Sequence, residues 1–427
     1  MATLTLPTPA LIVLVGPSGA GKSTFARRHF APTEVVSSDS LRAMLGDDPG
    51  RQDINEQTFE LLHRVVEIRL SLLRSVVVDA TNLEARGREP LRRLARAAGL
   101  PAVLVVLDLP QEECVLADAR RDRSVGPAVI AEQFVLLTGL QAAAPNEGWS
   151  EIHAIDPRDA VVERIPLPPD RRDEAGPFDL IGDVHGCDRE LGELLAKLGY
   201  DDGRHPDGRR LVFVGDLVDR GPDSPGVLRR VLPWLEDGRA LAVPGNHEER
   251  LLRWWRKPGG DARGGLKPTL EQLDAAPDAD DLRRRAEAFF ADAPPYLWLD
   301  DGDLLVAHGG LEEALHGRIG KRVRGFALYG KTTGKRDAQG LPERLDWAPG
   351  YSGRPAVVHG HVPVARAEWR NNTANIDLGC CFGGRLCALR WPERTFIDVP
   401  AERCWWPLAG ARRRLPPPGE PAGGRFP

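Results

Sequence analysis

The chain has 427 residues, of which 42% are hydrophobic and 28% charged, an ordinary globular composition that is too long for one small core. The net charge of −5 excludes a bulk electrostatic attraction to nucleic acid and leaves only a local basic groove for such contact. Six cysteines without a CxxC pair fit structural thiols in a reducing cytosol, and no apolar stretch reaches the roughly 20 residues of a membrane helix. We therefore expect two domains in a soluble, cytoplasmic protein.

The first part of the chain alternates short apolar, β-branched runs with longer helical patterns. The runs lie at residues 11–15, 76–78 and 103–107. Such alternation is typical of βαβ units on a parallel sheet. It predicts an α/β domain over residues 1–165.

A phosphate-binding loop follows the first apolar run. The letters GPSGAGKS at residues 16–23 match GxxxxGK[ST] between a predicted strand and a predicted helix, an order that disfavours a chance glycine-rich turn. In such a loop, backbone N–H groups surround the phosphates, the lysine reaches the β- and γ-oxygens, and the hydroxyl binds Mg²⁺. The sequence predicts an ATP and Mg²⁺ site formed by Gly16, Gly19, Gly21, Lys22, Ser23 and Thr24.

Asp39 and Arg42 follow the next short strand, in VVSSDSLR. A carboxylate at this point can accept the proton of an incoming hydroxyl, and an arginine can position the acceptor, as in a kinase. Asp39 could instead cap a helix that begins at Ser40, because Asp is a favoured N-cap. Both roles stay open.

Three arginines in ADARRDRSVG lie on a predicted helix and turn that resemble the lid of small P-loop kinases. We expect Arg120 and Arg123 to meet the transferring phosphoryl group, and Arg121 is a third candidate. Charge runs of this kind are also common on solvated faces. Asp79 and Asn82, at the end of another strand in VVVDATN, are expected near the same site.

The composition changes after this domain. Residues 166–177, PLPPDRRDEAGP, combine four prolines with clustered charge and predict an extended linker. A second domain, expected over residues 178–411, contains short buried strands that each end in a polar residue. Residues 257–293 read as an insertion near its site, and residues 412–427 as a disordered tail.

Five segments carry the chemistry of this second domain. They are GDVHG, GDLVDRG, GNHE, AHGG and HGH, at residues 182–186, 215–221, 245–248, 307–310 and 359–361. In this order they resemble the calcineurin-like metallophosphoesterase superfamily, which implies an α/β/β/α sandwich. The fold class predicted for the whole chain is therefore α/β, with a P-loop kinase domain on a parallel sheet ahead of this sandwich.

The resemblance implies six metal ligands, with Asp216 as the bridge between two ions. The first ion would be held also by Asp183 and His185, and the second by Asn246, His308 and His361. A bridging carboxylate keeps two divalent ions about 3.5 to 4 Å apart, which activates a shared water and stabilises the attacking and leaving oxygens. Mixed His, Asp and Asn ligands favour Mn²⁺, Fe or Ni²⁺ over a structural zinc, and we expect Mn²⁺.

Three further residues have predicted roles near these ligands. His247 is next to Asn246 and is expected to protonate the leaving group, and Arg220 is expected to bind the phosphate oxygens. His359 could be a ligand, a partner of a ligand or a core residue.

The order of the two domains resembles the bacterial polynucleotide kinase-phosphatase family, which heals RNA ends. Residues 329–377, beginning YGKTTGKRDAQGLPERLDW, resemble a segment of that family's phosphatase, in which Asp377 also belongs to the active site. The resemblance implies an ATP-dependent 5′-OH polynucleotide kinase joined to a 2′- and 3′-phosphatase with 2′,3′-cyclic phosphodiesterase activity. Its macromolecular partners would be RNA or DNA ends.

Well-known members of that family continue into a ligase-type domain with a nucleophilic lysine in a KxxG setting. Lys331 fits that setting, but it lies between two metal-ligand segments, and fewer than about 100 residues follow it. We interpret Lys331 as a loop residue. Sealing would then need a separate ligase, and a 3′-end methyltransferase is a second expected partner.

Two other functions stay open. The phosphatase motifs also resemble diadenosine tetraphosphate hydrolases and PPP-type protein phosphatases, so the chain could join such an enzyme to a small-molecule kinase. The P-loop could also be a nucleotide sensor in a binding protein. Asp39 and Arg42 count against the sensor, and the segment at residues 329–377 counts against the first alternative.

Overall fold

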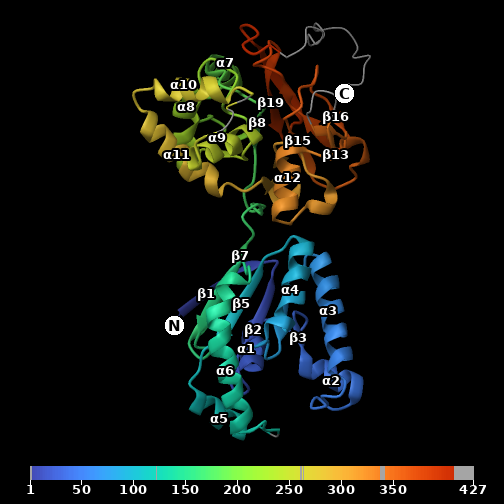
Figure 1. The fold of residues 1–427 in the computed structure, drawn as a ribbon. Helices are drawn as coiled ribbons and strands as arrows, with labels where there is room; N and C mark the ends of the chain where they lie inside the picture. The colour runs from blue at the N-terminus through green and yellow to red at the C-terminus, as the bar shows by residue number, and fades with distance from the viewer. Residues whose placement is uncertain (1, 122, 260–261, 263, 337–341, 408–427) are drawn as a thin grey trace. The chain divides into compact units, whose positions relative to one another are not determined.

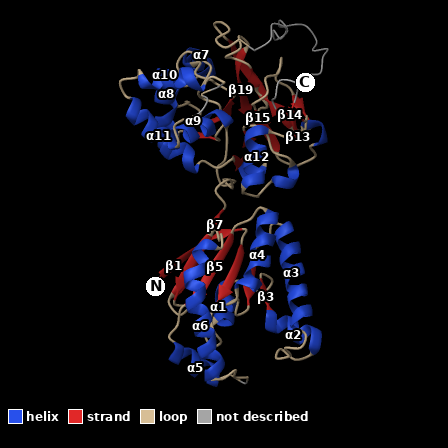
Figure 2. Ribbon diagram, viewed as in Figure 1, coloured by secondary structure: helices blue, strands red, loops and turns tan. Residues whose placement is uncertain are grey.

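The computed structural model divides into two compact α/β units, which are described separately (Figures 1 and 2). The first comprises Met1–Leu167 with Gly317–Gly320, and the second Pro168–His316 with Lys321–Pro427. The structure describes residues 2–121, 123–259, 262, 264–336 and 342–407. The tail predicted over residues 412–427 lies outside this range.

The first unit is built on a parallel sheet with the strand order β3-β4-β2-β5-β6. Strands β2, β4 and β5 consist mainly of Val, Ile and Leu and are buried along their whole length, as expected of a parallel sheet with helices on both faces. Because β2 is the central strand, the loop that follows it opens at the middle of the sheet's carboxyl edge. The strands of this sheet are β2 Leu11–Val15, β3 Val35–Ser37, β4 Val76–Asp79, β5 Ala102–Leu107 and β6 Glu151–Ile155.

A separate two-stranded parallel sheet pairs the first strand of the chain with the last strand of this unit, β1 Ala2–Thr8 and β7 Ala160–Pro166. Leu4, Leu6 and Ala160 of these strands belong to the core that also contains Phe25. The helices of the unit are α1 Lys22–His29, α2 Ser38–Gly46, α3 Asn55–Ser71, α4 Ala85–Ala98, α5 Gln111–Ala119 and α6 Pro127–Ala143, with the 3₁₀ turn η1 Ala144–Asn146.

Helix α6 and η1 together form a segment long and apolar enough, by those two criteria alone, to cross a membrane. Its mean hydropathy is 1.3, and 22% of the most apolar window is buried. This differs from the expectation that no such stretch exists, because the apolar residues here are spread along a helix rather than gathered in one run. Ile130, Leu137 and Leu140 of α6 belong to the cores of the unit, as in a helix that covers a sheet.

The second unit contains two facing sheets. The first has the order β10-β9-β8-β19-β18 with β20 beside β19, and the second has the order β11-β12-β15-β17-β16. One hydrophobic cluster takes Leu180 and Val212 from the first sheet and Val306 and Val358 from the second, so the sheets pack face to face. The strands of the first sheet are β8 Phe178–Ile181, β9 Arg210–Phe213, β10 Ala240–Ala242, β18 Asp377–Leu378, β19 Arg385–Trp391 and β20 Thr395–Pro400. Those of the second are β11 Tyr296–Leu299, β12 Leu304–Ala307, β15 Ala356–His359, β16 Trp369–Arg370 and β17 Thr373–Asn375.

Helices cover the outer faces of both sheets. Leu191, Val227 and Leu251 from three helices share a core with the first sheet, and Val323 of α12 shares one with the second. The predicted P-loop domain followed by an α/β/β/α sandwich is therefore confirmed. The helices are α7 Asp188–Leu198, α8 Ser224–Glu236, α9 Asn246–Arg256, α10 Leu266–Asp274, α11 Ala279–Asp292 and α12 Lys321–Tyr329, with 3₁₀ turns η2 Asp300–Gly302, η3 Glu313–Leu315 and η4 Ala348–Gly350, and a hairpin of β13 Thr332–Arg336 and β14 Pro342–Arg344.

The segment expected as an extended linker, residues 166–177, is held against the second unit over much of its length. The backbone of Trp298 on β11 donates to Pro169 O at 2.8 Å and accepts from Arg171 N at 2.9 Å. Gly176 N donates to the Asp300 carboxylate at 3.1 Å. The backbone of this segment therefore extends the sheet beside β11, because an extended backbone can hydrogen-bond to a neighbouring strand.

The insertion expected over residues 257–293 forms α10 and α11, which complete the first core of the second unit. Leu266, Leu282 and Phe290 are buried there. Helix α10 also supports the loop after β9, since the Gln272 side chain accepts from Ser224 N at 2.9 Å and donates to Gly221 O at 3.0 Å. The insertion therefore holds a functional loop in place.

Candidate phosphoryl-transfer and metal sites

The loop between β2 and α1 has the conformation of a phosphate cradle. Gly19 has φ +83°, and a Cβ at this position would lie 2.0 Å from Cys114 O, so only glycine fits. The Lys22 ammonium is buried and donates to Gly16 O at 2.7 Å and to Pro17 O at 2.8 Å. The lysine is thus folded over the loop whose backbone would receive the phosphates.

A carboxylate and a hydroxyl stand next to this lysine. Burial lowers the pKa of Lys22 to about 8, although Asp79 opposes the shift. Burial raises the pKa of Asp79, and its hydrogen bond from Ser23 opposes that. A serine hydroxyl and a carboxylate at the end of a neighbouring strand are the groups that hold Mg²⁺ beside a P-loop. Asn82 donates to the backbone of β2 at 2.8 Å, and Thr24 is exposed on the first turn of α1.

Asp39 and Arg42 form an ion pair on α2. Arg42 Nη1 donates to Asp39 Oδ1 at 2.7 Å, and Arg42 Nε donates to Asn55 Oδ1 at 2.9 Å. Helix α2 begins at Ser38 with Ser37 as its N-cap, so Asp39 is not the cap, and its side chain is 69% exposed. The negative charge of Asp39 reaches Lys22, whose pKa it raises. An exposed carboxylate held by an arginine near the lysine has the position of a proton acceptor for an incoming hydroxyl.

The three arginines past α5 differ in their surroundings. Arg123 donates to Gly50 O at 3.1 Å, and Arg120 is exposed at the end of the helix. The charge of Arg121 lowers the pKa of Lys22, so Arg121 is the one whose charge acts on the P-loop. Sequence reasoning favoured Arg120 and Arg123, because a run of arginines does not reveal which member acts on the lysine.

In the second unit, each of the five segments lies at the end of a strand. The candidate ligands therefore lie at one edge of the two sheets, in the loops that follow the carboxyl ends of the strands. Several ligands have left-handed backbone: φ is +49° at His185, +52° at Asp216 and +76° at His361. Asp183 and His185 follow β8, Asp216 follows β9, Asn246 opens α9 after β10, His308 follows β12, and His361 follows β15.

Asp216 lies at the centre of the site. Its Oδ2 is 3.4 Å from His185 Nε2, 3.4 Å from His308 Nε2 and 3.8 Å from His247 Nε2. The possible ligand atoms form two groups, and the atoms within each group lie within 4.8 Å of one another. One group contains His185, Asp216 and His247, and the other contains Asp216, His308 and His361. Asp216 belongs to both groups, which is the arrangement of a bridging carboxylate.

Two more carboxylates lie beside this pair of groups. Asp183 accepts from His361 N at 3.1 Å, and Asp377 accepts from Gly379 N at 2.9 Å. Burial raises the pKa of Asp377 to about 6, and burial together with the charges of Asp377 and Asp216 raises that of Asp183 well above its usual value. Although burial opposes it, His308 and its neighbours hold the pKa of Asp216 well below the usual range. Bound cations would strongly stabilise three buried carboxylates among imidazoles, because they compensate the negative charge.

The residues present fit divalent ions. His361 Nε2 is buried and has no hydrogen-bond partner within the described part of the chain. The Asn246 amide oxygen lies 3.1 Å from His308 Nε2, so it points at the same centre. Imidazole nitrogens and carboxylate and amide oxygens suit first-row divalent ions.

His247 forms a buried pair with Asp219. Its Nδ1 lies 2.6 Å from Asp219 Oδ2, and Arg250 donates to the same oxygen. Burial lowers the pKa of His247, and the charges of Asp216 and Asp219 oppose this shift. The Asp219 contact fixes the ring so that Nε2 faces Asp216, as expected of a proton donor to a leaving group. Sequence reasoning missed Asp219, although it lies in the GDLVDRG segment.

Two arginines reach the centre from different elements. Arg220 Nη1 donates to His185 Nε2 at 2.6 Å, and its guanidinium stacks over Phe382 at 5.1 Å. Arg344 of β14 is exposed, and its charge, after burial and His308, helps to hold the pKa of His361 well below the usual value. Arg344 belongs to the segment at residues 329–377, and its approach to the centre was not foreseen.

Glu248 fixes the loop that carries Asp216. Its carboxylate accepts from the backbone N–H groups of Asp216, Leu217 and Gly245 at 2.8 Å and of Val218 at 3.2 Å. Burial and the charge of Asp216 raise its pKa to about 7. Four converging donors stabilise a backbone that would otherwise be strained.

His359 and Lys331 lie apart from these groups. His359 is buried, its ring centroid lies 5.2 Å from that of Trp347, and burial lowers its pKa to about 4. It belongs to neither ligand group around Asp216 and therefore packs as a core residue. Lys331 is exposed and donates to Glu312 at 3.0 Å.

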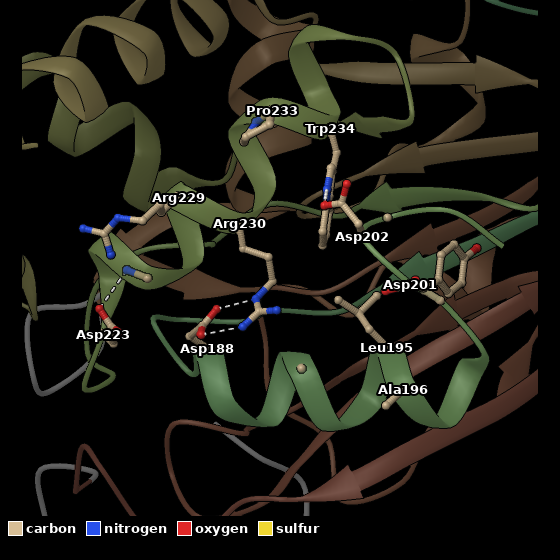
Figure 3. A pocket seen from close by; sticks show the side chains of 14 residues that line it. Asp188, Leu195, Ala196, Asp201, Asp202, Asp223, Arg229, Arg230, Pro233 and Trp234 are labelled. Carbon is tan, nitrogen blue, oxygen red and sulfur yellow. Dashed lines mark hydrogen bonds and ion pairs between the residues drawn. The ribbon is translucent and has the colours of Figure 1, made fainter.

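A surface cavity of about 560 Å³ lies between α7 and α8 (Figure 3). Asp188, Arg230, Asp202 and Trp234 are among its lining residues, and Arg230 forms a two-fold ion pair with Asp188 at 2.6 and 2.8 Å. None of the ligand residues lines it. The cavity is therefore separate from the metal centre.

In comparison with known proteins, each unit matches a different family model. Residues 11–141 match the model of an AAA domain, and residues 176–393 match that of the calcineurin-like phosphoesterases. The chain is 42% identical to the asymmetrical bis(5′-nucleosyl)-tetraphosphatase PrpE of Anoxybacillus flavithermus and 44% identical to that of Geobacillus sp., in each case over 52% of this chain and 94% of the relative. A solved structure provisionally assigned as a diadenosine tetraphosphatase is 26% identical, with a TM-score of 0.41, over 54% of this chain and 96% of its own.

Proposed function

Because the chain belongs to the calcineurin-like phosphoesterase family and carries a P-loop unit ahead of that match, we propose that it is a bifunctional polynucleotide kinase-phosphatase that heals RNA ends. One unit phosphorylates a 5′-hydroxyl end with ATP. The other removes 2′- or 3′-phosphate ends and opens 2′,3′-cyclic phosphates.

The observation that carries this proposal is the pairing of two phosphate sites with opposite chemistry. The first has an exposed carboxylate, Asp39, beside a P-loop lysine, which suits transfer to a hydroxyl rather than simple nucleotide hydrolysis. The second has two ligand groups that share Asp216, which suits phosphate-ester hydrolysis. Adding a phosphate at one end of a broken strand and removing one from the other prepares both ends for joining.

In the kinase unit, Asp39 accepts the proton of the 5′-hydroxyl while the hydroxyl oxygen forms a bond to the γ-phosphorus and the bond to ADP breaks. Lys22 and Arg121 stabilise the negative charge that moves toward the β–γ bridging oxygen. Arg42 holds Asp39 and positions the acceptor end. Mg²⁺, held by Ser23 and Asp79, would neutralise the phosphates.

In the phosphatase unit, two divalent ions, which we propose to be Mn²⁺, would supply an activated water when they are bound by Asp216 together with Asp183, His185, Asn246, His308 and His361, which leaves His247 free of metal. Arg220 binds oxygens of the phosphate. His247, oriented by Asp219, donates a proton to the ribose oxygen as the P–O bond breaks. The exposed Arg344, whose charge acts on His361, contacts a further phosphate of the nucleic-acid chain in this proposal.

The test is a set of end-labelled RNA substrates with the full chain. We expect 5′-OH RNA to gain labelled phosphate from ATP and Mg²⁺, and 3′-phosphate and 2′,3′-cyclic-phosphate RNA to lose phosphate with Mn²⁺. Lys22→Ala is the control for the first reaction and Asp216→Ala for the second. If neither RNA reacts while another phosphate ester is hydrolysed, the end-healing proposal is wrong.

A second candidate concerns the phosphoesterase unit alone. The relatives named above are bis(5′-nucleosyl)-tetraphosphatases, and the similarity covers 94% of their length, which favours hydrolysis of dinucleoside polyphosphates. Diadenosine tetraphosphate and a phosphoprotein are therefore included as competing substrates. A kcat/KM for either that exceeds that for RNA ends would favour a nucleotide or protein phosphatase joined to a small-molecule kinase.

We propose that the protein works in the cytoplasm and hands healed ends to a separate ligase, with a 3′-end methyltransferase as another partner. Copurification of tagged chain with either activity, abolished by nuclease, would show that RNA links them. Copurification that resists nuclease would show a direct contact.

A further inference from the structure

A second set of potential ligands lies outside both sites. Cys187, Glu190 and Cys380 are all buried, and one ligand atom from each lies within 4.8 Å of the other two. Cys187 is the N-cap of α7, Glu190 is in its first turn, and Cys380 is in the loop between β18 and β19. Chain segments almost 200 residues apart thus present two thiols and a carboxylate to one point.

One oxygen of this carboxylate is satisfied and the other is not. Glu190 Oε1 accepts from Glu402 N at 3.1 Å and from Trp405 Nε1 at 3.1 Å. Glu190 Oε2 is buried and has no hydrogen-bond partner among the residues that the structure describes. The thiol of Cys187 is hydrogen-bonded to Cys380. A buried carboxylate oxygen without a partner is costly, and a bound cation would satisfy it.

We propose that Cys187, Glu190 and Cys380 bind a third metal ion, a zinc ion, which is independent of the catalytic pair. Two thiolates and one carboxylate suit the borderline-soft Zn²⁺, whereas the ligand groups around Asp216 contain only nitrogen and oxygen donors. The thiol protons are released to solvent on binding. No further His, Cys, Asp or Glu side chain of the described residues joins this group, so the fourth ligand of a tetrahedral ion would come from another kind of group or from water.

The ion would connect the two loops that carry catalytic residues. Cys187 is two residues after His185, and its thiol donates to His185 O at 3.6 Å. Cys380 is three residues after Asp377. The zinc ion would therefore hold the ends of β8 and β18 at a fixed separation, a structural role that requires no contact with substrate.

Cobalt absorption tests the site directly. The full chain is stripped with a chelator and reloaded with Co²⁺, whose thiolate charge-transfer absorption reports only metal bound to cysteine. We expect this absorption in the unaltered chain and its loss in Cys187→Ala and Cys380→Ala. Cys387→Ala is the matched control, because Cys387 is equally buried on β19 and outside the group.

Glu190→Gln serves where the cysteine variants do not fold, since it keeps both thiols and nearly the same shape. We expect its cobalt affinity to fall by about tenfold or more, and intact-complex mass spectrometry to find one zinc fewer than in the unaltered chain. The proposal is overturned by any of three results: no charge-transfer absorption in the unaltered chain, equal absorption in the Cys380→Ala variant, or loss of two hydrogens through a Cys187–Cys380 disulfide.

Discussion

Lys22 is buried tightly enough for nucleotide binding to change its protonation. Its pKa is about 8 in the free protein, below the ordinary 10.5, because burial penalises the ammonium. Incoming phosphates favour the charged form and raise that pKa. At about pH 9 the free lysine is mostly neutral and the bound lysine is charged, so binding takes up a proton, whereas at about pH 7 it is charged in both states.

Calorimetry in two buffers of different ionisation enthalpy measures this uptake. We expect it to rise from near zero at about pH 7 toward one proton at about pH 9, with weaker nucleotide affinity as pH increases. Lys22→Met should show no such rise. Equal uptake in the variant would assign the proton to another group.

The Asp219–His247 pair has a chemical signature of its own. His247→Asn is expected to slow hydrolysis of an alkyl phosphate by about 10²- to 10⁴-fold and of an activated aryl phosphate much less, because the aryl leaving group needs no proton. Asp219→Asn should act in the same direction with a smaller loss. Equal losses on both esters would contradict the role of His247 as a proton donor.

The same pair should make the ratio of alkyl to aryl phosphate hydrolysis depend on pH in one direction. Because burial lowers the pKa of His247, its protonated form is abundant only at acidic pH. The ratio of the alkyl to the aryl rate should therefore fall as pH rises from acidic to neutral values. Using the ratio removes the ionisation of metal-bound water, which affects both esters alike.

Residue types at strand ends could be predicted from sequence, whereas inward-facing partners could not. Asp216 and His308 follow short buried strands, so their shared edge follows from topology alone. Asp219 is three residues past Asp216 and has a left-handed backbone itself, and Arg344 comes from a hairpin distant in sequence. Their approach to the centre depends on tertiary folding that no local pattern encodes.

At the scale of elements, the P-loop turn depends on one glycine. Gly19→Ala combines a left-handed backbone with a Cβ 2.0 Å from Cys114 O, so we expect a loss of about 1–3 kcal/mol in unfolding free energy and a loss of nucleotide binding. Denaturant unfolding and nucleotide titration check this. Gly139→Ala in α6, where an added Cβ meets nothing within 4 Å, should stabilise by about 0.5–1 kcal/mol with binding unchanged.

Two elements show where composition gives incomplete information. The proline-rich residues 166–177 predicted a linker, yet their extended backbone pairs with β11, because proline still offers a carbonyl to a sheet edge. The charged residues 257–293 predicted an insertion of open role, and the helices formed there are amphipathic, with Leu282 and Phe290 inward. In both segments most of the charged residues face the solvent, whereas a few apolar side chains or backbone groups make the contacts with the rest of the unit.

At the scale of the whole molecule, the two activities should be separable. Lys22→Ala or Asp39→Ala is expected to abolish phosphoryl transfer and leave phosphate-ester hydrolysis at its full rate. Asp216→Ala or Asn246→Ala is expected to do the reverse. Steady-state rates of both reactions on each purified variant test this, and a single variant that loses both while keeping its melting temperature would show that the sites depend on each other.

The left-handed backbone at His185, Asp216 and His361 has a consequence for how this protein tolerates change. Each such residue costs about 1–2 kcal/mol relative to an ordinary conformation, and glycine would remove most of that cost. Heat resistance and catalysis therefore favour opposite residues at the same positions. A library selected only for survival of heating, without metal or substrate, should accumulate glycine at these three positions and lose hydrolysis as it gains stability.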